Sequence, residues 1–310
     1  MDAPRLRWLR VTVRIVLWTL AVVVGLVALI ALSVPLAGIG SKGRLDAVTN
    51  VTIPGVGGPD VKAYVARPTA PGPHPAVIMV HEFWGLREDI ARKADLLAEE
   101  GYVVIAPDVF RGSTTSWIPR AIYQVISTPA EQINADLDSV NAWIASQPEV
   151  DAERTAIVGF CFGGRSAMLY SLHNPKLRGT VVFYGNPPLD AERLRALQGP
   201  VLGIFGGADQ SIPLTDVAAF ERALKQANVE STVTVYPDQP HAFIETVDTI
   251  KAGGVQGQAW SQMLRFLEGA LVAQPAPSSS GSPQAASDRI GWSYVLRLGM
   301  SHLMGHSSRQ

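Results

Sequence analysis

The segment Gly159–Gly164, with the sequence GFCFGG, constrains the fold of this chain more than any other feature. It follows the short apolar run Thr155–Val158 and precedes Arg165–Tyr170, a stretch with helical character. A strand, a tight glycine turn and a helix form a nucleophile elbow, usually written G-x-S-x-G, and Cys161 here replaces the serine. Glycines suit this turn because the nucleophile has a strained backbone and neighbouring chain segments approach closely. We therefore expect Cys161 at a helix N-terminus, where free N–H groups favour a thiolate and a developing oxyanion.

Cys161 is also the only cysteine among the 310 residues. It therefore has no intrachain disulfide partner and no second cysteine with which to bind a metal. A free cysteine in another context is usually a small buried hydrophobe. The surrounding motif favours a nucleophile instead.

Apolar runs and helical patterns alternate between Arg44 and Ala273. The predicted strands are Val61–Ala66, Ala76–Val80, Tyr102–Ala106, Thr155–Val158, Gly179–Tyr184, Val201–Phe205 and Thr232–Tyr236. The predicted helices are Glu88–Glu100, Pro129–Ser146, Gly163–His173, Ala191–Ala196, Leu214–Ala227 and Gln256–Val272. Continuous apolar runs are typical of strands buried on both faces of a parallel sheet, and the alternation predicts an α/β domain over residues 44–273 with helices on both faces. In such sheets, functional residues gather at the carboxyl ends of the strands.

Two further residues follow predicted strands and form a constellation with Cys161. Asp209 comes shortly after the strand Val201–Phe205, and His241 follows the strand Thr232–Tyr236 after a short turn. A cysteine nucleophile needs a base that accepts its proton, and the base needs an orienting acceptor. Singly, a loop aspartate is usually a turn residue and a lone histidine is usually solvated. Together, the order nucleophile, acid, histidine predicts an α/β-hydrolase with these three residues as its triad.

The segment His81–Leu86 (HEFWGL) directly follows the predicted strand Ala76–Val80. In an α/β-hydrolase this loop supplies one donor of the oxyanion hole, and the residue after the nucleophile supplies the other. We therefore expect the backbone N–H groups of Phe83 and Phe162 to form the oxyanion hole.

Five segments resemble the dienelactone hydrolase family: HEFWGL (81–86), APDVFRG (106–112), GFCFGG (159–164), GGAD (206–209) and PHAF (240–243). The resemblance implies a hydrolase of carboxylic esters or lactones that works through a thiol acyl-enzyme. It also implies that Glu82 corresponds to the family's glutamate, which holds the resting thiol and takes its proton when substrate arrives. A salt bridge to Arg87 or Arg92 is the alternative for Glu82.

The expected substrate pocket departs from this family. Where the resemblance implies an arginine shortly after the histidine, this chain has Glu245, which would repel a carboxylate. Arg111 and Arg120 lie in a lid-like stretch, residues 111–127, and supply positive charge. Aromatic residues in the motifs indicate an apolar or aromatic acyl group. The expected substrate contacts are Trp84, Phe160, Arg120 and Phe243.

The N-terminal part has the pattern of a membrane anchor. Residues 15–38 carry no charge, and the basic segment 1–14 before them contains Arg5, Arg7, Arg10 and Arg14. About 20 apolar residues suffice to cross a bilayer as a helix. The charge asymmetry predicts a cytoplasmic N-terminus and an extracytoplasmic domain. A cleaved signal peptide and a secreted domain are the alternative, although the apolar region of such a peptide is usually only about 7–15 residues long.

The C-terminal part has two sections. Residues 274–287 (QPAPSSSGSPQAAS) predict a linker, because such a composition cannot build a core. Residues 288–310 mix apolar residues with arginines. They form either an amphipathic helix on a membrane surface or a poorly ordered tail.

Composition restricts the function further. The net charge of −1 gives no indication of a nucleic-acid partner. The sequence has neither a glycine-rich phosphate loop nor histidines at metal-ligand spacing, so we expect no cofactor and no metal. The predicted function is a membrane-tethered esterase or lactonase acting on a small-molecule substrate. The alternatives are a catalytically silent domain used as an envelope binding or scaffold module, and an acyltransferase or thioesterase with the same triad.

Overall fold

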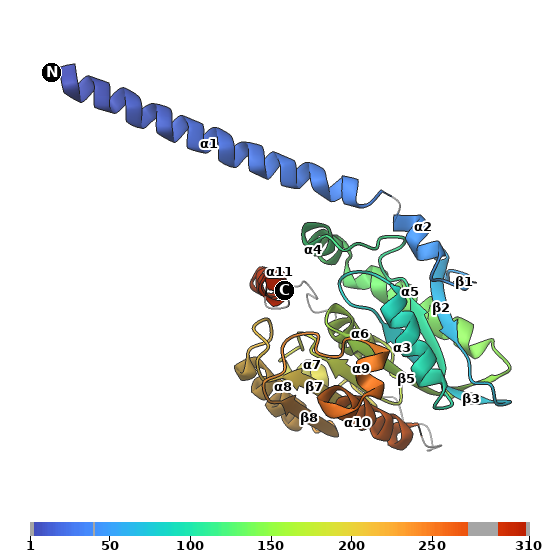
Figure 1. Ribbon diagram of the computed structural model, residues 1–310. Coiled ribbons are helices and arrows are strands. Elements are labelled where there is room, and N and C mark those ends of the chain that lie inside the picture. The colour runs from blue at the N-terminus through green and yellow to red at the C-terminus, as the bar shows by residue number, and fades with distance from the viewer. Residues whose placement is uncertain (1–2, 40, 272–290, 308–310) are drawn as a thin grey trace.

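An eight-stranded sheet in the order β1-β2-β4-β3-β5-β6-β7-β8 forms the centre of the protein. The computed structural model describes residues 3–39, 41–271 and 291–307 (Figure 1). β1 and β2 run antiparallel to each other and β2 runs antiparallel to β4, whereas all other neighbouring strands are parallel. The strands are β1 Val51–Ile53, β2 Val61–Ala66, β3 His74–Val80, β4 Val103–Pro107, β5 Val150–Phe160, β6 Thr180–Phe183, β7 Val201–Gly206 and β8 Ser231–Tyr236.

Helices connect the strands and cover the sheet (Figure 1). They are α1 Ala3–Ala37, α2 Ser41–Asp46, α3 Glu88–Ala98, α4 Ile118–Ser127, α5 Ala130–Ala145, α6 Phe162–His173, α7 Ala191–Leu194, α8 Leu214–Gln226, α9 Val247–Lys251, α10 Gly254–Ala270 and α11 Trp292–Ser307. This arrangement confirms the predicted fold class, an α/β fold with a mostly parallel central sheet.

Burial of apolar strands explains the order of the sheet. Every residue of β4, β6 and β7 is buried, as expected for strands covered by helices on both faces. The edge strand β8 is only partly buried along its length. Each valine or isoleucine that is removed from water contributes roughly 1.5–3 kcal/mol to stability. The continuous apolar runs therefore occupy the centre of the sheet, where this gain is largest.

The structure differs from the sequence prediction in several elements. The stretch 111–127 contains the helix α4, which the sequence pattern did not indicate because it is short and Pro119 lies in its first turn. β5 begins at Val150 rather than Thr155, since charged residues at its exposed start interrupt the apolar run. The short elements α2, α9 and β1 were not predicted either.

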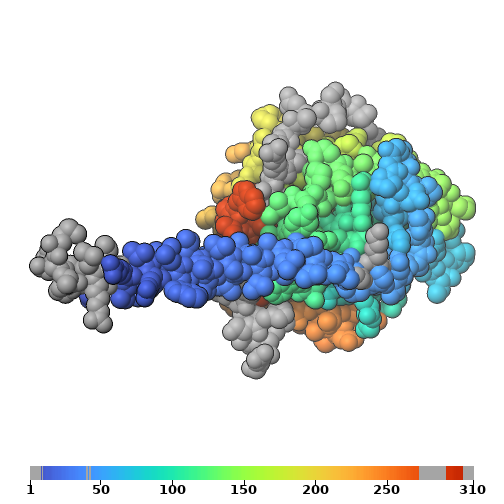
Figure 2. All heavy atoms as spheres, turned by 90° about the horizontal axis from the view of Figure 1, so that it is seen from above, coloured from blue at the N-terminus to red at the C-terminus, as the bar shows by residue number. Residues whose placement is uncertain are grey.

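The helix α1 projects from the domain (Figures 1 and 2). Within it, Arg10–Ala37 is long and apolar enough to cross a membrane, and a signal sequence near an N-terminus has the same properties. Its C-terminal end contacts α4: Trp117 Nε1 donates a hydrogen bond of 3.0 Å to Ser33 Oγ, and Arg120 Nη1 lies 3.5 Å from the carbonyl oxygen of Val34. The last turns of α1 are therefore attached to the domain.

The C-terminal segment contains the helix α11, which lies over the carboxyl edge of the sheet (Figure 1). Tyr294, Val295 and Leu298 of this helix are buried against the domain. The predicted linker 274–287 lies outside the described residues.

Candidate active site

Cys161 occupies the sharp turn between β5 and α6. Its backbone has φ 55° and ψ −115°, a conformation that residues other than glycine rarely adopt. The Cys161 N–H donates to the carbonyl of Phe183 at 2.9 Å, and its own carbonyl accepts from the N–H of Gly164 at 3.0 Å. These bonds to β6 and to α6 hold the strained turn in place. The cysteine is 1% exposed.

Two glycines of the elbow are required by close backbone contacts. A Cβ atom at Gly159 would lie 2.0 Å from the carbonyl oxygen of Gly163. A Cβ atom at Gly163 would lie 2.2 Å from the carbonyl oxygen of Val80 and 2.5 Å from that of His81. The first turn of α6 therefore packs directly against the end of β3, and this contact brings the loop after β3 next to Cys161.

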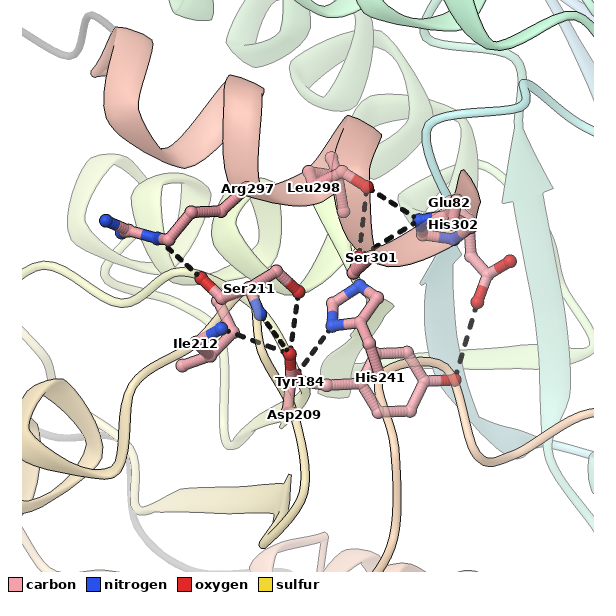
Figure 3. Close-up of polar contacts among 10 residues, drawn as sticks. All are labelled: Glu82, Tyr184, Asp209, Ser211, Ile212, His241, Arg297, Leu298, Ser301 and His302. Carbon is pink, nitrogen blue, oxygen red and sulfur yellow. Dashed lines mark hydrogen bonds and ion pairs between the residues drawn. The ribbon is translucent and has the colours of Figure 1, made fainter. Parts of the chain in front are cut away.

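Asp209 and His241 lie together at the ends of β7 and β8 (Figure 3). The Nδ1 atom of His241 is 2.7 Å from Asp209 Oδ2. The other oxygen, Oδ1, accepts hydrogen bonds from the Ser211 N–H, the Ser211 hydroxyl and the Ile212 N–H at 2.7, 2.6 and 3.1 Å. Burial acts to raise the pKa of Asp209, but the bonds from His241 and Ser211 outweigh it and the pKa is lowered. Asp209 is therefore a fixed, ionised acceptor for the imidazole.

The imidazole of His241 lies beside Cys161. Its Nε2 atom is buried, and the side chain as a whole is 4% exposed. Burial disfavours the charged ring, but the negative charges of the Cys161 thiolate and of Asp209 outweigh it and raise the pKa of His241 to about 10. Asp209 thus binds His241 directly, and Cys161 is close enough to His241 to act on the charge of its ring.

The loop after β3 places Glu82 at the same edge of the sheet. Its Oε1 atom accepts a hydrogen bond from the Tyr184 hydroxyl at 3.4 Å (Figure 3). Burial raises the pKa of the Glu82 carboxyl, and the positive charge of Lys93 partly opposes this effect. The alternative salt bridge is not formed, because Arg92 pairs with Glu88 at 2.6 Å and Arg87 lies 4.0 Å from Asp89.

The two expected oxyanion donors also lie at this edge. Phe162 is the first residue of α6, so its N–H is among those without a partner inside the helix. Phe83 is fully buried in the loop after β3, and its carbonyl oxygen accepts from Gln124 Nε2 of α4 at 3.1 Å. This bond fixes the loop that carries the Phe83 N–H.

The structure places only two of the four residues expected to contact substrate close to the candidate site. Trp84 packs against Phe83, with ring centroids 4.3 Å apart, and Phe243 contacts Tyr184 at 5.8 Å, so both lie near the triad. Phe160 does not line the site, because its ring is fully buried and stacks on Phe183 at 4.8 Å.

Arg120 was also expected to contact substrate, and the structure places its side chain between Ser113, Tyr123 and the end of α1. Its guanidinium donates to Ser113 Oγ at 2.8 Å, lies near the Val34 carbonyl and stands over the ring of Tyr123 at 5.3 Å. These contacts direct its charge towards the end of α1. Arg111 is likewise engaged, in an ion pair with Asp136 at 2.8 Å.

Helix α11 contributes residues to the site that the sequence did not indicate. Tyr294 is 2% exposed, and burial together with the charge of the neighbouring Cys161 raises the pKa of its hydroxyl well above the ordinary value. The ring of His302 lies 5.5 Å from that of His241 and 4.6 Å from that of Phe83. The available sequence signal was the run of Tyr294, Val295 and Leu298 at helical spacing, but this pattern does not specify what the helix packs against.

A cavity of about 750 Å³ lies between α4, α5, α6 and α11, and its lining includes Phe162, the residue after Cys161. Phe162, Leu169, Val125 and Val295 form part of its apolar lining, while Arg165 and Glu131 supply charge. Within residues 3–39, 41–271 and 291–307, no three histidine, cysteine or acidic side chains come together in a way that could hold a metal ion.

Comparison with known proteins identifies the family of this chain. The sequence profile described as "Dienelactone hydrolase family" matches residues 61–271. A Salmonella typhimurium protein named "Putative carboxymethylenebutenolidase" is 40% identical over 201 residues, which cover 60% of this chain and 74% of the relative. A protein of the same name from Escherichia coli K12 is 36% identical over 226 residues, covering 68% of this chain and 83% of the relative.

A solved structure shows the same fold. The crystal structure titled "Putative Dienelactone Hydrolase" from Klebsiella pneumoniae superimposes with a TM-score of 0.63 at 36% sequence identity, covering 70% of this chain and 96% of that one. The matched region of the profile contains Glu82, Cys161, Asp209 and His241 but ends before α11. The chain therefore belongs to the dienelactone hydrolase family and is a hydrolase.

Proposed function

We propose that this protein cleaves carboxylic esters or lactones with Cys161 as nucleophile, His241 as general base and acid, and Asp209 as the group that orients the imidazole. The observation that carries the proposal is the bond of His241 to Asp209, with Cys161 beside His241 on a strained elbow at the carboxyl edge of the sheet. The butenolide in the names of the relatives is a lactone, which supports lactones beside open-chain esters.

The first half of the reaction follows from these positions. The Cys161 thiolate attacks the carbonyl carbon of the ester, and the carbonyl electron pair moves to oxygen. The N–H groups of Phe162 and Phe83 stabilise the resulting oxyanion. When the intermediate collapses, the carbon–oxygen bond of the ester breaks, and His241 gives its proton to the departing alkoxide. A thioester on Cys161 remains.

The second half regenerates the enzyme. His241, now neutral, accepts a proton from water, and the hydroxide equivalent attacks the thioester carbonyl. The carbon–sulfur bond breaks, the acid product leaves, and Cys161 returns to the thiolate paired with protonated His241. Asp209 keeps the Nδ1–H of His241 in place throughout, so that Nε2 faces the reacting atoms.

Glu82 has a separate role in this proposal. Its carboxylate is held by Tyr184 and lies in a buried environment that raises its pKa. A carboxylate with a raised pKa is a stronger proton acceptor than an ordinary one. We assign it the control of the thiol proton: between turnovers protonated Glu82 gives its proton to the thiolate, which protects the sulfur from oxidation, and when substrate arrives the Glu82 carboxylate takes this proton back and regenerates the thiolate beside protonated His241.

The proposal includes a membrane tether. Residues 15–38 form the span, residues 1–14 the cytoplasmic segment, and residues 44–273 an extracytoplasmic domain. The support is the apolar helix Arg10–Ala37 together with the arginines that precede and begin it. Such a location implies a substrate that is met at the cell envelope.

Hydrolysis of a panel of lactones and p-nitrophenyl esters by the purified full chain tests this function. Cys161→Ala should lower kcat by about 10⁶-fold, because removing a nucleophile eliminates the acyl-enzyme pathway. His241→Ala should be nearly as damaging, since the thiol loses its proton partner. Residual activity of Cys161→Ala within about tenfold of wild type would overturn the role of Cys161, and a wild-type protein that hydrolyses no member of the panel would favour the silent scaffold domain.

A further inference from the structure

The active site is closed in this structure. Cys161 is 1% exposed, and the side chains of His241 and Asp209 are 4% and 0% exposed. Helix α11 lies over His241 and Asp209, as Figure 3 shows. A substrate carbonyl must come within bonding distance of the sulfur, so some of the residues that cover Cys161 have to move before the reaction can start, and α11 is one of the elements that cover it.

Several contacts hold α11 over the site. The Nε atom of Arg297 donates to the carbonyl oxygen of Ser211 at 3.2 Å, and Ser211 is the residue whose N–H and hydroxyl orient Asp209 (Figure 3). The His302 ring packs against His241, and Tyr294 is buried beneath the helix. The helix is thus attached to the catalytic residues themselves and lies outside the region shared with the family.

The opposite face of α11 is also apolar. Trp292, Leu296 and Met300 recur every fourth residue, and they are 68%, 61% and 52% exposed. A helix with apolar residues on both sides is usually buried in protein or immersed in a membrane. Among the described parts of the chain, nothing covers this outer face.

Helix α4 continues the apolar surface. Trp117, which precedes the helix, and Tyr123 and Ile126 within it are 46%, 50% and 44% exposed. A Cβ atom at Gly299 of α11 would lie only 2.9 Å from Ile122 of α4. Because α4 also binds the last turns of α1, this surface begins where the proposed membrane span ends. Both views place α4 and α11 on the side of the domain from which α1 leaves (Figures 1 and 2).

We propose that the outer faces of α4 and α11 form one lipid-binding surface, and that contact with the bilayer draws α11 away from the catalytic residues and opens the site. This inference rests on the proposed membrane tether. A bilayer can shift the equilibrium between the closed and the open position of α11 because it makes different contacts with the helix in the two positions. When the site is closed, only the outer face of α11 contacts lipid. In the open position, the face that carries Tyr294, Val295 and Leu298 contacts lipid as well. Interfacial helices bind bilayers in this way, through apolar residues buried at the headgroup boundary.

The sole cysteine allows a direct test of opening. Full-length protein is reconstituted in phosphatidylcholine–phosphatidylglycerol vesicles, and the rate of Cys161 alkylation by iodoacetamide is measured by mass spectrometry. We expect the double variant Leu296→Gln, Met300→Gln to be alkylated about tenfold more slowly than wild type, since its outer face no longer favours lipid. Leu214→Gln, the same change at an exposed leucine of α8, is the matched control and should react like wild type.

Lipid contact is measured separately with a spin label. A label on Met300→Cys in a Cys161→Ser background should collide with lipid-soluble oxygen more often than with a water-soluble nickel chelate. A label on Glu221→Cys of α8 should show the reverse. A water-exposed label at position 300 overturns the lipid-binding surface, and equal alkylation of the double variant and wild type overturns the opening step. Neither readout requires ester hydrolysis, so an inactive wild-type protein would refute the proposed function and leave this inference to be judged on its own.

Discussion

Replacing Asp209 with asparagine changes one atom group at the centre of the proposed triad. In the structure, Oδ1 accepts three hydrogen bonds from Ser211 and Ile212, while Oδ2 faces Nδ1 of His241 at 2.7 Å. The amide oxygen of asparagine must take the Oδ1 position to satisfy these three donors. The NH₂ group then faces His241, whose Nδ1 must lose its hydrogen and become an acceptor. The remaining proton moves to Nε2, which can no longer accept a proton from the reacting groups.

The size of the effect has two sources. Opposite charges about 4 Å apart, at an effective dielectric constant of about 20, interact by about 4 kcal/mol, which is roughly a factor of 10³ in an equilibrium constant. The wrong tautomer adds to this loss, so we expect kcat/KM to fall by about 10³–10⁴-fold, less than for Cys161→Ala. The expected change in thiol reactivity follows from the pKa of His241. Burial lowers this pKa, but the charges of Cys161 and Asp209 favour the protonated ring and raise the pKa to about 10. Without the Asp209 charge this pKa falls, the thiolate–imidazolium pair is less populated, and alkylation of Cys161 near neutral pH slows.

The assay combines ester hydrolysis with alkylation of Cys161 across pH 5–9, and Asp190→Asn is the control. Asp190 caps α7 by accepting two backbone N–H groups on one oxygen, and asparagine caps a helix about equally well. The control should therefore retain wild-type kinetics. Hydrolysis by Asp209→Asn within tenfold of wild type, in a protein that unfolds at the wild-type temperature, would refute the assigned role of Asp209.

Three further predictions test the elbow, Glu82 and the membrane span. Gly163→Ala should lower the free energy of unfolding in urea by more than about 2 kcal/mol, because its Cβ would lie 2.2 Å from the Val80 carbonyl oxygen. Gly269→Ala is the control: no atom lies within 4 Å of its new Cβ, so this change should be neutral or stabilising. An equal response of the two variants would contradict the backbone contact. Because burial raises the pKa of Glu82 above 4.5, an acid limb should appear above that pH in the alkylation profile of wild type and disappear in Glu82→Gln. An unchanged profile would remove Glu82 from proton control. Full-length protein should stay with membranes in high salt, and a reporter fused after residue 40 should be extracytoplasmic; recovery of mature protein beginning near Ala37 would instead demonstrate a cleaved signal peptide.

Much of the fold was predictable because its signals are local. The buried strands β3, β4 and β7 are continuous apolar runs, and the tight turn at Cys161 requires glycines whose positions are visible in the sequence. The order of Cys161, Asp209 and His241 along the chain predicted which residues would meet at the carboxyl edge, because parallel strands end at the same side of a sheet.

Other parts of the site depend on contacts between segments far apart in the chain. Phe160 and Phe162 flank the nucleophile equally in sequence, but strand geometry buries Phe160 against Phe183 and helix geometry places Phe162 beside the cavity. Arg120 was expected near the substrate, yet the unpredicted helix α4 directs it towards the end of α1. In each case side-chain direction follows from the secondary structure and packing of the residue rather than from its distance to a motif.

The α/β class and the sharp turn at Cys161 could be predicted from the sequence, and so could the candidates for the proposed triad, since each depends on residue type within a few positions of a turn or strand. The bond between Tyr184 and Glu82, the fixing of Asp209 Oδ1 by Ser211 and the position of α11 over the site could be seen only in the folded protein. The physical reason is that an apolar helix face specifies burial but not the surface against which it is buried. For α11, that surface is assembled from loops after β3, β7 and β8 only when the whole chain has folded.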